Sequence, residues 1–565
     1  MKGVTKKFGL QVFCAALVLF CIPLGAGEGA VFYVTQEGAG LRNGSSWENA
    51  CGEAEFKAAL DAAPFGSEFW VAAGKYRPLP SSTPPAGTVP VPEREVSFAL
   101  KSGVTLYGGF LGSETLRRQR NFTENVTVLT GDLDLDDVVD DDGVTETAED
   151  IRGENSYTVV TSTGTVAMNT GIMDGFVITG GSADYPENVG GSRQYGGGMY
   201  NSGSAAVVRN CIFRGNYAEW GGGAVCNQSS SISMGYCSFS GNSSRSGAGM
   251  YNRASSPELT SCTFEGNTAR TDAAAIHNYD GSSPLISGCT FAGNRAEWDG
   301  GAVGNVDDCS PVIINCTFSG NVSGGDSLFH LGGGAIVSAG NCNPQITNCT
   351  FSGNVVLDGF AGAISNSANS NAVITNCTFS GNEATSGGGM LNFDSSPLVV
   401  NCTFSGNSAD SAAGMQNIGG GTPVVKNCIF WDNSGETAAE IENDSSTTPS
   451  VSYCVVRYGY SGGSSIFTGN PNLGPLADNG GYTETHALLA GSSALDKGTA
   501  SGAPSTDQRG TPRPQGTGYD IGSFEFAPSS DSGCAAVSAG SMAPLLLLPL
   551  LFLSVLKMTV DRKER

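Results

Sequence analysis

The clearest candidates for metal chemistry in this sequence are seven aspartates in a run that ends at Gly143: Asp132, Asp134, Asp136, Asp137, Asp140, Asp141 and Asp142. Asp132, Asp134 and Asp136 alternate along the chain, so a loop can turn their carboxylates toward one hard cation. Ca²⁺ prefers such oxygen ligands. The run lacks the glutamate that closes an EF-hand loop, because Gly143 is the twelfth position counted from Asp132. These three residues are therefore candidate Ca²⁺ ligands, and a solvated surface insertion is the alternative.

Groups for acid–base catalysis are not clustered in the sequence. Glycoside hydrolases need two facing carboxylates, whereas Asp307 and Asp308 are adjacent and would point to opposite faces of a strand. The nearest upstream basic residue is Arg295. The three histidines, at 277, 330 and 486, are far apart, which argues against a metal site built from histidine. We therefore predict no catalytic residue and no organic cofactor site.

The cysteines indicate the elements that must hold these residues. Ten of the 17 cysteines recur about every 26 residues, most of them in a phrase close to Asn-Cys-Thr-Phe-Ser-Gly-Asn. A fixed period of this length predicts stacked repeats, each burying its apolar face against the next. The ten are Cys211, Cys237, Cys262, Cys289, Cys316, Cys349, Cys377, Cys402, Cys428 and Cys454.

The composition of the repeats favours strands over helices. Glycine is frequent, leucine is sparse, and no helical spacing of apolar residues runs through the region. A leucine-rich repeat needs regular leucines, so the predicted fold is a parallel β-helix, an all-β solenoid with coils about 4.8 Å apart. The alternation in Ile314-Asn-Cys-Thr-Phe318 predicts that Ile314, Cys316 and Phe318 point inward.

Two kinds of side chain are predicted to stack coil on coil. The ten cysteines should form one inward stack of small buried apolar groups. Cys309 and Cys342 differ, because each lies in turn sequence seven residues before a repeat cysteine, and they are the candidate disulfide. The last asparagine of each phrase should stack at one turn, because Asn tolerates left-handed backbone and its amide can bond the next coil. These are Asn216, Asn242, Asn267, Asn294, Asn321, Asn354, Asn382, Asn407 and Asn433.

Charge and the two ends of the chain restrict partners and location. A net charge of −24 argues against nucleic acid as a partner, because phosphate binding needs a basic face. A basic start, an apolar stretch over 8–24 and small residues predict a secretory signal cut after Ala26 or Ala30. A polar spacer, Cys534, an apolar stretch over 543–556 and a basic end predict a membrane-associated tail.

Two parts of the chain resemble secreted or surface β-helix proteins. Residues 31–180 are similar to the N-terminal part of bacterial pectin-lyase-like proteins, for example in Trp70-Val-Ala-Ala-Gly74-Lys-Tyr76. The repeats resemble the polymorphic outer-membrane protein repeat in Gly333-Gly-Ala-Ile336 and Phe351-Ser-Gly-Asn354. These resemblances imply a right-handed β-helix exposed at a cell surface. Helical spacing over 50–63 predicts one helix that caps the N-terminal end of the solenoid.

The C-terminal third carries two further resemblances. Residues 470–526 are similar to the choice-of-anchor Q domain, most clearly in Asp507-Gln-Arg-Gly510 and Asp520-Ile-Gly-Ser-Phe-Glu525. The end of the chain resembles a Synerg-CTERM sorting signal, which implies processing near Gly533 and Cys534. Both resemblances imply attachment of the exported protein to the cell surface or outer membrane through its C-terminus.

These observations predict five regions along the chain: a signal peptide (1–30), an N-terminal cap with the first coils (31–194), the β-helix repeats (195–455), a choice-of-anchor Q-like domain (456–528) and a sorting or transmembrane tail (529–565). The predicted function is non-catalytic: an adhesin or display protein that binds glycans or the surface of a host or neighbouring cell. A polysaccharide lyase or glycoside hydrolase on the same fold is the alternative. An enzyme should show a cleft where Asp converges with Arg or Lys.

Overall fold

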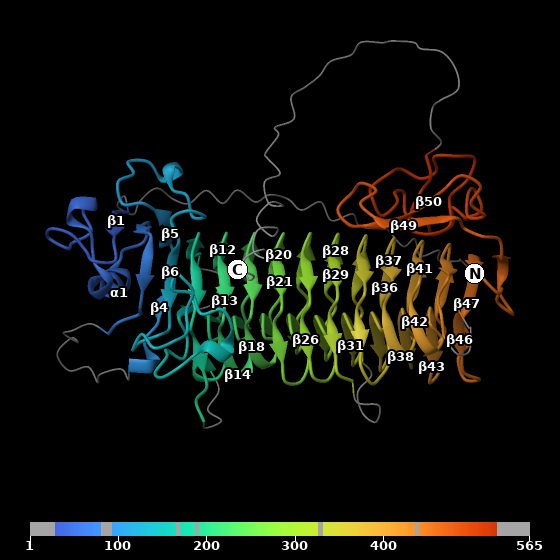
Figure 1. Cartoon of the computed structure of the whole chain (residues 1–565), viewed down its shortest axis with the longest axis horizontal. Helices are drawn as coiled ribbons and strands as arrows, with labels where there is room; N and C mark the ends of the chain where they lie inside the picture. The colour runs from blue at the N-terminus through green and yellow to red at the C-terminus, as the bar shows by residue number, and fades with distance from the viewer. Residues whose placement is uncertain are drawn as a thin grey trace, which may run out of the picture. The chain divides into compact units, whose positions relative to one another are not determined.

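Parallel strands stacked coil on coil build the protein, as Figure 1 shows for a computed structural model that describes residues 29–80, 93–164, 170–186, 191–325, 332–435 and 440–527. The described part of the chain up to Phe526 forms one compact unit. All its strand pairs are parallel except one hairpin near the C-terminus. The predicted all-β solenoid is confirmed.

Among the described residues, the largest sheet has 27 strands and contains two parallel rows, which share β47. The first row is β1 (Val31–Val34), β2 (Glu68–Ala72), β5 (Thr105–Phe110), β8 (Ile172–Asp174), β12 (Val207–Arg209), β16 (Ser233–Gly235), β20 (Glu258–Thr260), β24 (Leu285–Ser287), β28 (Val312–Ile314), β32 (Gln345–Thr347), β36 (Val373–Thr375), β40 (Leu398–Val400), β44 (Val424–Lys426), β47 (Ser450–Val456) and β48 (Ser464–Phe467). The second row is β3 (Gly74–Tyr76), β6 (Thr127–Thr130), β9 (Val177–Thr179), β13 (Ile212–Arg214), β17 (Ser238–Ser240), β21 (Thr263–Glu265), β25 (Thr290–Ala292), β29 (Thr317–Ser319), β33 (Thr350–Ser352), β37 (Thr378–Ser380), β41 (Thr403–Ser405) and β45 (Ile429–Trp431).

Two further sheets complete the solenoid. The nine-stranded sheet holds β10 (Ser182–Ala183), β14 (Tyr217–Gly221), β18 (Ser243–Ser246), β22 (Thr268–Ala269), β26 (Arg295–Ala296), β30 (Val322–Ser323), β34 (Val355–Val356), β38 (Glu383–Ser386) and β42 (Ser408–Ser411). The twelve-stranded sheet holds β4 (Phe98–Ala99), β7 (Val160–Thr163), β11 (Met199–Ser202), β15 (Val225–Gln228), β19 (Met250–Arg253), β23 (Ile276–Tyr279), β27 (Val303–Val306), β31 (Ile336–Ala339), β35 (Ile364–Ser367), β39 (Met390–Phe393), β43 (Met415–Ile418) and β46 (Ile441–Asn443).

One predicted side-chain orientation, that of Ile314, is wrong because the chain turns a corner between the two strand rows. Asn315 lies between β28 and β29 and has a φ of 55°, a left-handed conformation that asparagine tolerates. The chain turns there, so the alternation of inward and outward side chains starts afresh on each side. Ile313 is fully buried, whereas Ile314 lies at the half-buried surface, contrary to the prediction. Cys316 and Phe318 point inward as predicted.

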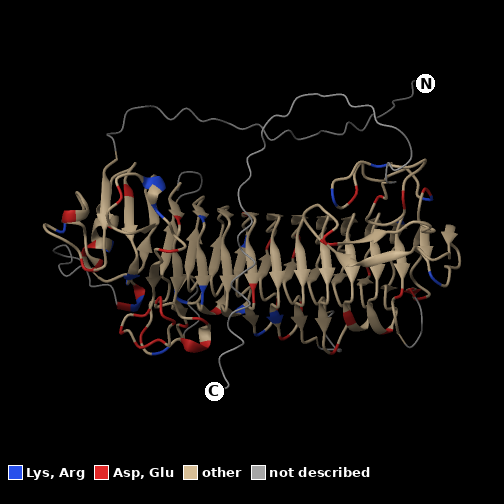
Figure 2. Ribbon diagram, turned by 45° about the horizontal axis from the view of Figure 1, so that its top comes forward, with Lys and Arg blue, Asp and Glu red and all other residues tan. Residues whose placement is uncertain are grey.

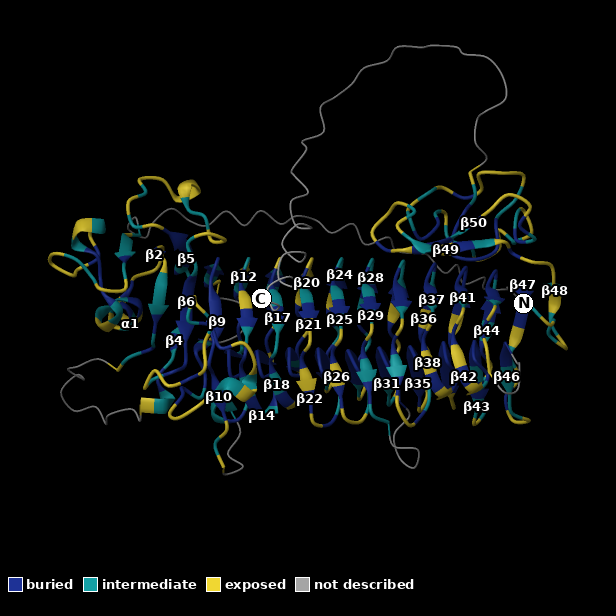
Figure 3. Ribbon diagram, viewed as in Figure 1, coloured by how far each residue is buried: buried dark blue, intermediate teal, exposed yellow. Residues whose placement is uncertain are grey.

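The cysteine stack is confirmed. All ten repeat cysteines are at most 2 % exposed, and the backbone N–H of Cys262 donates to Cys289 Sγ at 3.4 Å. Beside them, the phenylalanines of the same phrase form a continuous stack from Phe213 to Phe430. Their ring centroids lie 4.3–5.2 Å apart. Figure 3 shows this buried interior along the strands.

The asparagine stack is confirmed, but its backbone geometry is not. From Asn216 to Asn433, each side-chain amide donates to the Oδ1 of the next coil at 2.7–3.0 Å. The left-handed residue is the one before each asparagine, because the asparagine must turn inward to reach its neighbour. It is a glycine, as at Gly320 (φ 59°), except before Asn433, where Asp432 has a φ of 59°. A second asparagine ladder, from Asn201 to Asn305 and from Asn366 to Asn443, lines the twelve-stranded sheet.

Helix α1 (Glu53–Ala62) closes the N-terminal end of the solenoid. It starts later than predicted, because Cys51 forms a β-bridge with Val34. Phe56 and Leu60 are fully buried, and the Phe56 ring lies 5.1 Å from that of Phe98. Five 3-10 turns are also described: η1 (Trp47–Asn49), η2 (Glu93–Glu95), η3 (Arg117–Gln119), η4 (Ala148–Asp150) and η5 (Gly191–Arg193).

The segment 470–526 folds back onto the outer face of the second strand row, over β37 and β41 in Figure 1. It contains the antiparallel hairpin of β49 (Leu473–Ala477) and β50 (Thr485–Leu488). Gln508 accepts from Thr378 Oγ1 at 2.7 Å and donates to Thr350 Oγ1 at 2.9 Å. The segment therefore shares one compact unit with the repeats.

The predicted processing sites fall mostly beyond this part of the chain. Ala26, Gly533 and Cys534 lie outside the described residues, and Ala30 precedes β1. Among the described residues, no helix combines the length and apolar character that a bilayer span requires.

Candidate functional site

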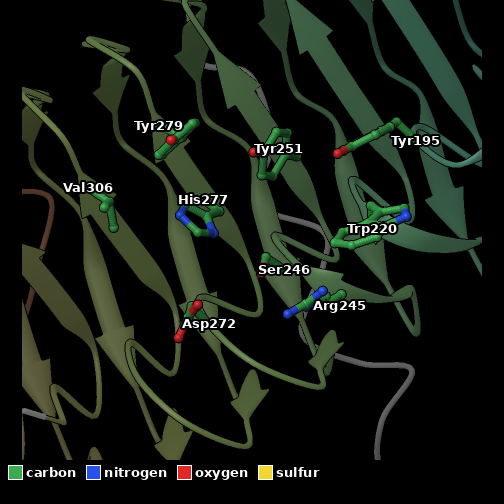
Figure 4. Close-up of a pocket in the computed structure, with 9 residues that line it drawn as sticks. All are labelled: Tyr195, Trp220, Arg245, Ser246, Tyr251, Asp272, His277, Tyr279 and Val306. Atoms are coloured by element: carbon green, nitrogen blue, oxygen red, sulfur yellow. The ribbon is translucent and has the colours of Figure 1, made fainter. Parts of the chain in front are cut away.

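A groove of about 280 Å³ opens on the outer surface where the nine-stranded and twelve-stranded sheets meet, and Figure 4 shows its side chains. Its residues come from successive coils, so their spacing follows the parallel register of β11, β15, β19, β23 and β27. We call this site the aromatic groove. It is lined by Tyr195, Trp220, Arg245, Ser246, Tyr251, Asp272, His277, Tyr279 and Val306.

Aromatic rings line one side of the aromatic groove. The Tyr251 ring lies 5.7 Å from that of Tyr195 and 5.5 Å from the imidazole of His277. Gly221 makes room for this arrangement, because a Cβ there would approach the Tyr251 ring to 2.7 Å. Trp220 is the penultimate residue of β14 and is half-buried. Such rings present flat apolar faces with polar edges, the surface on which a sugar ring can pack.

Charged and hydroxyl groups lie opposite the tyrosines. The Arg245 guanidinium is 4.7 Å from the centroid of the Trp220 ring, within the range of a cation–π contact. Ser246 is held by a 2.7 Å hydrogen bond between its hydroxyl and that of Thr271. Asp272 is half-buried in the loop between β22 and β23. The groove therefore offers both hydrogen-bonding groups and stacking faces.

His277 is the most buried polar group in the aromatic groove. It is 7 % exposed, and neither ring nitrogen has a hydrogen-bond partner among the described residues. Burial lowers the pKa of His277, and the nearby negative charge of Asp272 opposes that shift. The imidazole is accordingly neutral near pH 7, with one donor and one acceptor nitrogen.

None of these groove residues is predicted as a binding residue from the sequence, where His277 appears only as one of three scattered histidines. The repeat phrases draw attention to invariant positions, whereas the groove uses the outward position whose residue changes from coil to coil. In register, that position is occupied by Cys226, Tyr251, His277, Gly304 and Val337. Aligning the repeats on their asparagines and reading the variable outward column would have found it.

The three candidate Ca²⁺ ligands do come together. One carboxylate oxygen of each of Asp132, Asp134 and Asp136 lies within 4.8 Å of the others. Asp132 is buried and its Oδ1 accepts from the Asp136 N–H at 3.1 Å, while Asp134 and Asp136 are exposed. Gly153 faces them closely, since a Cβ there would lie 2.6 Å from oxygens of both Asp134 and Asp136. The oxygen-only donor set fits Ca²⁺.

We call residues 132–143 the acidic loop; it lies near the N-terminal coils in Figure 2, and charge repulsion and burial shift the pKa values of its carboxylates. Partial desolvation and the neighbouring Asp134 charge raise the pKa of Asp136. Burial raises the pKa of Asp137 to about 6, although Arg152 N–H, Asn155 and Thr145 donate to its carboxylate. Among the described residues, this loop is the acidic group that could hold a metal ion.

The remaining cysteine, aspartate and histidine residues considered in the sequence do not come together in a common site among the described residues. Cys309 and Cys342 are buried free thiols on adjacent coils, and Cys309 N–H donates to Cys342 Sγ at 3.2 Å. Their disulfide stays a prediction. Asp307 and Asp308 both have positive φ, 58° and 60°, in the turn after β27. His486 lies in β50, where its ring nitrogens are 2.8 Å from Gly474 O and 3.0 Å from Ser380 Oγ.

Comparison with known proteins identifies the family. The chain matches the family described as "Right handed beta helix region" over residues 169–318 and 302–474, which together make up more than half of its length. The chain belongs to the right-handed β-helix family. Its solenoid is accordingly a right-handed parallel β-helix. No curated protein matches the chain.

One solved structure is among the matches to this chain. The chain is similar to the structure titled "Crystal structure of pectate lyase Pel9A", with 14 % identity and a TM-score of 0.32. The match covers 89 % of this chain and 97 % of that chain. At this identity and TM-score, the lyase activity of that protein does not carry over to the present β-helix.

Proposed function

We propose that this protein is an exported, surface-attached β-helix that binds a glycan in the aromatic groove without cleaving it. The observation that carries the proposal is the combination of Tyr195, Trp220 and Tyr251 with Arg245 and Asp272 in one open groove. Aromatic faces pack on sugar rings, and polar groups at the rim orient the hydroxyls. The sequence features of the two termini support export and attachment.

The chemistry of the groove favours binding over hydrolysis. The described residues that line it include one carboxylate, that of Asp272. Hydrolysis on two carboxylates requires a second one about 5–9.5 Å away, facing the same sugar. The three clustered aspartates of the acidic loop are not among the residues of the groove.

Alanine substitution of the groove aromatics tests the proposal. The purified protein, its Trp220→Ala and Tyr251→Ala variants, and Tyr482→Ala as control would be screened on a glycan array. Tyr482 is 77 % exposed in the C-terminal segment, so its loss should leave binding unchanged. We expect each groove variant to lose roughly tenfold in affinity, about 1.4 kcal/mol. Equal binding by all four proteins would refute the groove as the site.

A polysaccharide-cleaving enzyme is the second candidate, because Asp272 and Arg245 line one groove, the combination expected of an enzyme on this fold, and His277 lies in the same groove as a third acid–base group. The same proteins would be incubated with each polysaccharide that binds, and unsaturated products and new reducing ends would be measured. Turnover that is lost in His277→Ala or Asp272→Ala would replace the binding function with a catalytic one.

A further inference from the structure

We infer that Cys309 and Cys342 form a disulfide that crosslinks two neighbouring coils of the repeats. The inference is separate from glycan binding, because it concerns how the solenoid is held together and not what it binds. Neither cysteine is among the residues that line the aromatic groove. Both are buried thiols in equivalent turns, Cys309 after β27 and Cys342 after β31.

The two cysteines lie opposite each other on adjacent coils. Before the turn, β27 pairs with β31, as in Val306 with Ala339, and after it β28 pairs with β32, both at the offset of 33 residues that also separates the cysteines. Neighbouring strands lie about 4.8 Å apart, within the Cα separation that a disulfide bridges. The Cys309 N–H donates to Cys342 Sγ at 3.2 Å. A hydrogen bond from the Cys342 thiol lowers the pKa of Cys309, so the two sulfurs face each other.

At this turn the neighbouring coils carry serine instead of cysteine. From Ser204 to Ser282, the backbone N–H of each serine donates to the hydroxyl of the serine on the next coil at 2.9–3.0 Å. The ladder continues beyond the cysteines, because the Cys342 N–H donates to Ser370 Oγ at 3.1 Å. Cys309 and Cys342 are therefore an isolated pair in a serine ladder. Each has one sulfur neighbour at this turn, whereas the inner members of the core cysteine stack have two.

The coil that carries Cys342 is also less well joined to its neighbours by side chains. Ser338 occupies the asparagine position of the second ladder and accepts from Asn305 Nδ2 at 3.2 Å. On the next coil, Asn366 Oδ1 has no hydrogen-bond partner among the described residues. The repeat is longest here, because Cys316 and Cys349 are 33 residues apart and the other repeat cysteines 25–28. A crosslink at this coil stabilises it by restricting the unfolded chain.

The bond forms by exchange with a second disulfide, which accepts the electrons. The Cys309 thiolate attacks that disulfide, which gives a mixed disulfide and releases one thiol. The Cys342 thiolate then attacks the Cys309 sulfur, so that the second thiol leaves and the Cys309–Cys342 bond forms. Two protein thiols are oxidised, and the acceptor disulfide is reduced to two thiols. Because both thiols are buried in the folded protein, the exchange takes place during folding, before the turn closes over them.

Refolding in a glutathione buffer tests the inference on the purified protein, independently of export and of glycan binding. The wild type would be refolded from urea with oxidised and reduced glutathione. Free thiols would then be alkylated under denaturing conditions, and peptides would be mapped by mass spectrometry. The matched control is the double variant Cys309→Ser/Cys342→Ser, because serine is the residue that continues the ladder on the neighbouring coils. If refolding fails, protein isolated without unfolding would be mapped in the same way.

The expected product is one pair of peptides joined through Cys309 and Cys342, with the ten core cysteines alkylated. The melting temperature of the oxidised wild type should fall when a reductant is present during unfolding, and that of the double variant should not change. Alkylation of Cys309 and Cys342 along with the other thiols would overturn the inference. Pairing within the core stack, for example of Cys316 with Cys349, would overturn it as well.

Discussion

Each asparagine at the end of the repeat phrase satisfies several polar groups that the solenoid buries. Asn354 is fully buried, and its Nδ2 donates to Phe318 O at 3.0 Å and to Asn382 Oδ1 at 2.9 Å. Its Oδ1 accepts from the backbone and the side chain of Asn321. The asparagine ladder therefore links adjacent coils by side-chain hydrogen bonds, as the parallel strands link them by backbone hydrogen bonds.

Substituting Asn354 tests the energetic weight of this ladder. Asn354→Ala should destabilise the protein by roughly 3 kcal/mol, because donors and acceptors on both adjacent coils lose a buried partner. Urea denaturation would measure the change. The control is Asn343→Ala on the same coil, since Asn343 is exposed and its loss should cost about 0.5 kcal/mol or less. Equal unfolding curves for the two variants would contradict the prediction.

Glu440 ends the asparagine ladder and gives it a pH dependence. Its Oε2 accepts from Asn433 Nδ2 at 2.6 Å, while Oε1 has no partner among the described residues. Burial raises the pKa of Glu440 from 4.5 to about 7. The folded state then binds more protons than the unfolded state between these two values, so stability decreases as the pH rises through this window.

The amide isostere of Glu440 should remove that pH dependence. Glu440→Gln should be more stable than the wild type at about pH 8, by up to about 3 kcal/mol, and the difference should vanish near pH 4. Denaturation midpoints at the two pH values would show this. Glu265→Gln is the control, because Glu265 is exposed on β21. A constant difference between wild type and variant across this range would be inconsistent with the raised pKa.

The acidic loop predicts a response to Ca²⁺ that is independent of glycan binding. If Asp132, Asp134 and Asp136 hold the ion, a free Ca²⁺ concentration ten times the Kd should stabilise the fold by about 1.4 kcal/mol. The double variant Asp134→Asn/Asp136→Asn should lose this response, and a chelator should reverse it in the wild type. Asp410→Asn should keep it, because Asp410 is exposed on β42. A wild-type melting temperature unaffected by Ca²⁺ would leave the solvated-insertion alternative.

Constant and variable positions of the repeats have different roles: the constant ones form the core and the variable ones form the outer surface. Inward positions carry the cysteine, phenylalanine and asparagine stacks, so each coil must keep the same residues. Outward positions are free to differ, and the twelve-stranded sheet uses them to place Tyr251, His277 and Gly304 on consecutive coils. The outward threonines of the second strand row instead form hydrogen bonds with the C-terminal segment.

Gln508 is the residue through which that segment should be tested. It is 1 % exposed and its amide bonds Thr350, Thr378 and Thr483. Gln508→Ala should destabilise the packing of residues 470–526 by about 2 kcal/mol, because several buried polar groups lose their partner. Limited proteolysis should then cut the segment faster than the coils. The control Gln345→Ala, exposed on β32, should show wild-type cleavage, and identical cleavage of Gln508→Ala would refute the role.

The proposed attachment to the cell surface involves both ends of the protein, because it requires export and then processing of the C-terminal tail. Its proposed order of parts is signal peptide, β-helix, C-terminal segment, spacer and tail, with Cys534 at the proposed processing site. Cys534→Ala should block processing, so that intact-mass measurement of cell-extracted protein finds the tail retained through Arg565. The wild-type protein should end near Gly533. Recovery of the full-length wild-type chain would refute the predicted processing, and a simple membrane anchor would then be the better explanation of the tail.

The sequence alone predicted the β-helix, the cysteine stack and the asparagine stack. It could do so because contacts in a solenoid join equivalent residues one period apart, and a period is visible in a single sequence. The capping helix was also predictable, because its apolar spacing is local. The alternation at Ile314 failed because the corner at Asn315 interrupts it, and corner geometry depends on how the coils stack.

Only the tertiary structure decided where function can reside. The aromatic groove joins variable residues from five coils at the boundary of two sheets, and no phrase in the sequence marks them. The contacts of Gln508 with Thr350 and Thr378 span more than 100 residues that no period relates. The physical reason is the same in both cases. Periodic burial determines the core through short-range repetition, whereas a binding surface depends on which unlike side chains the stacking brings face to face.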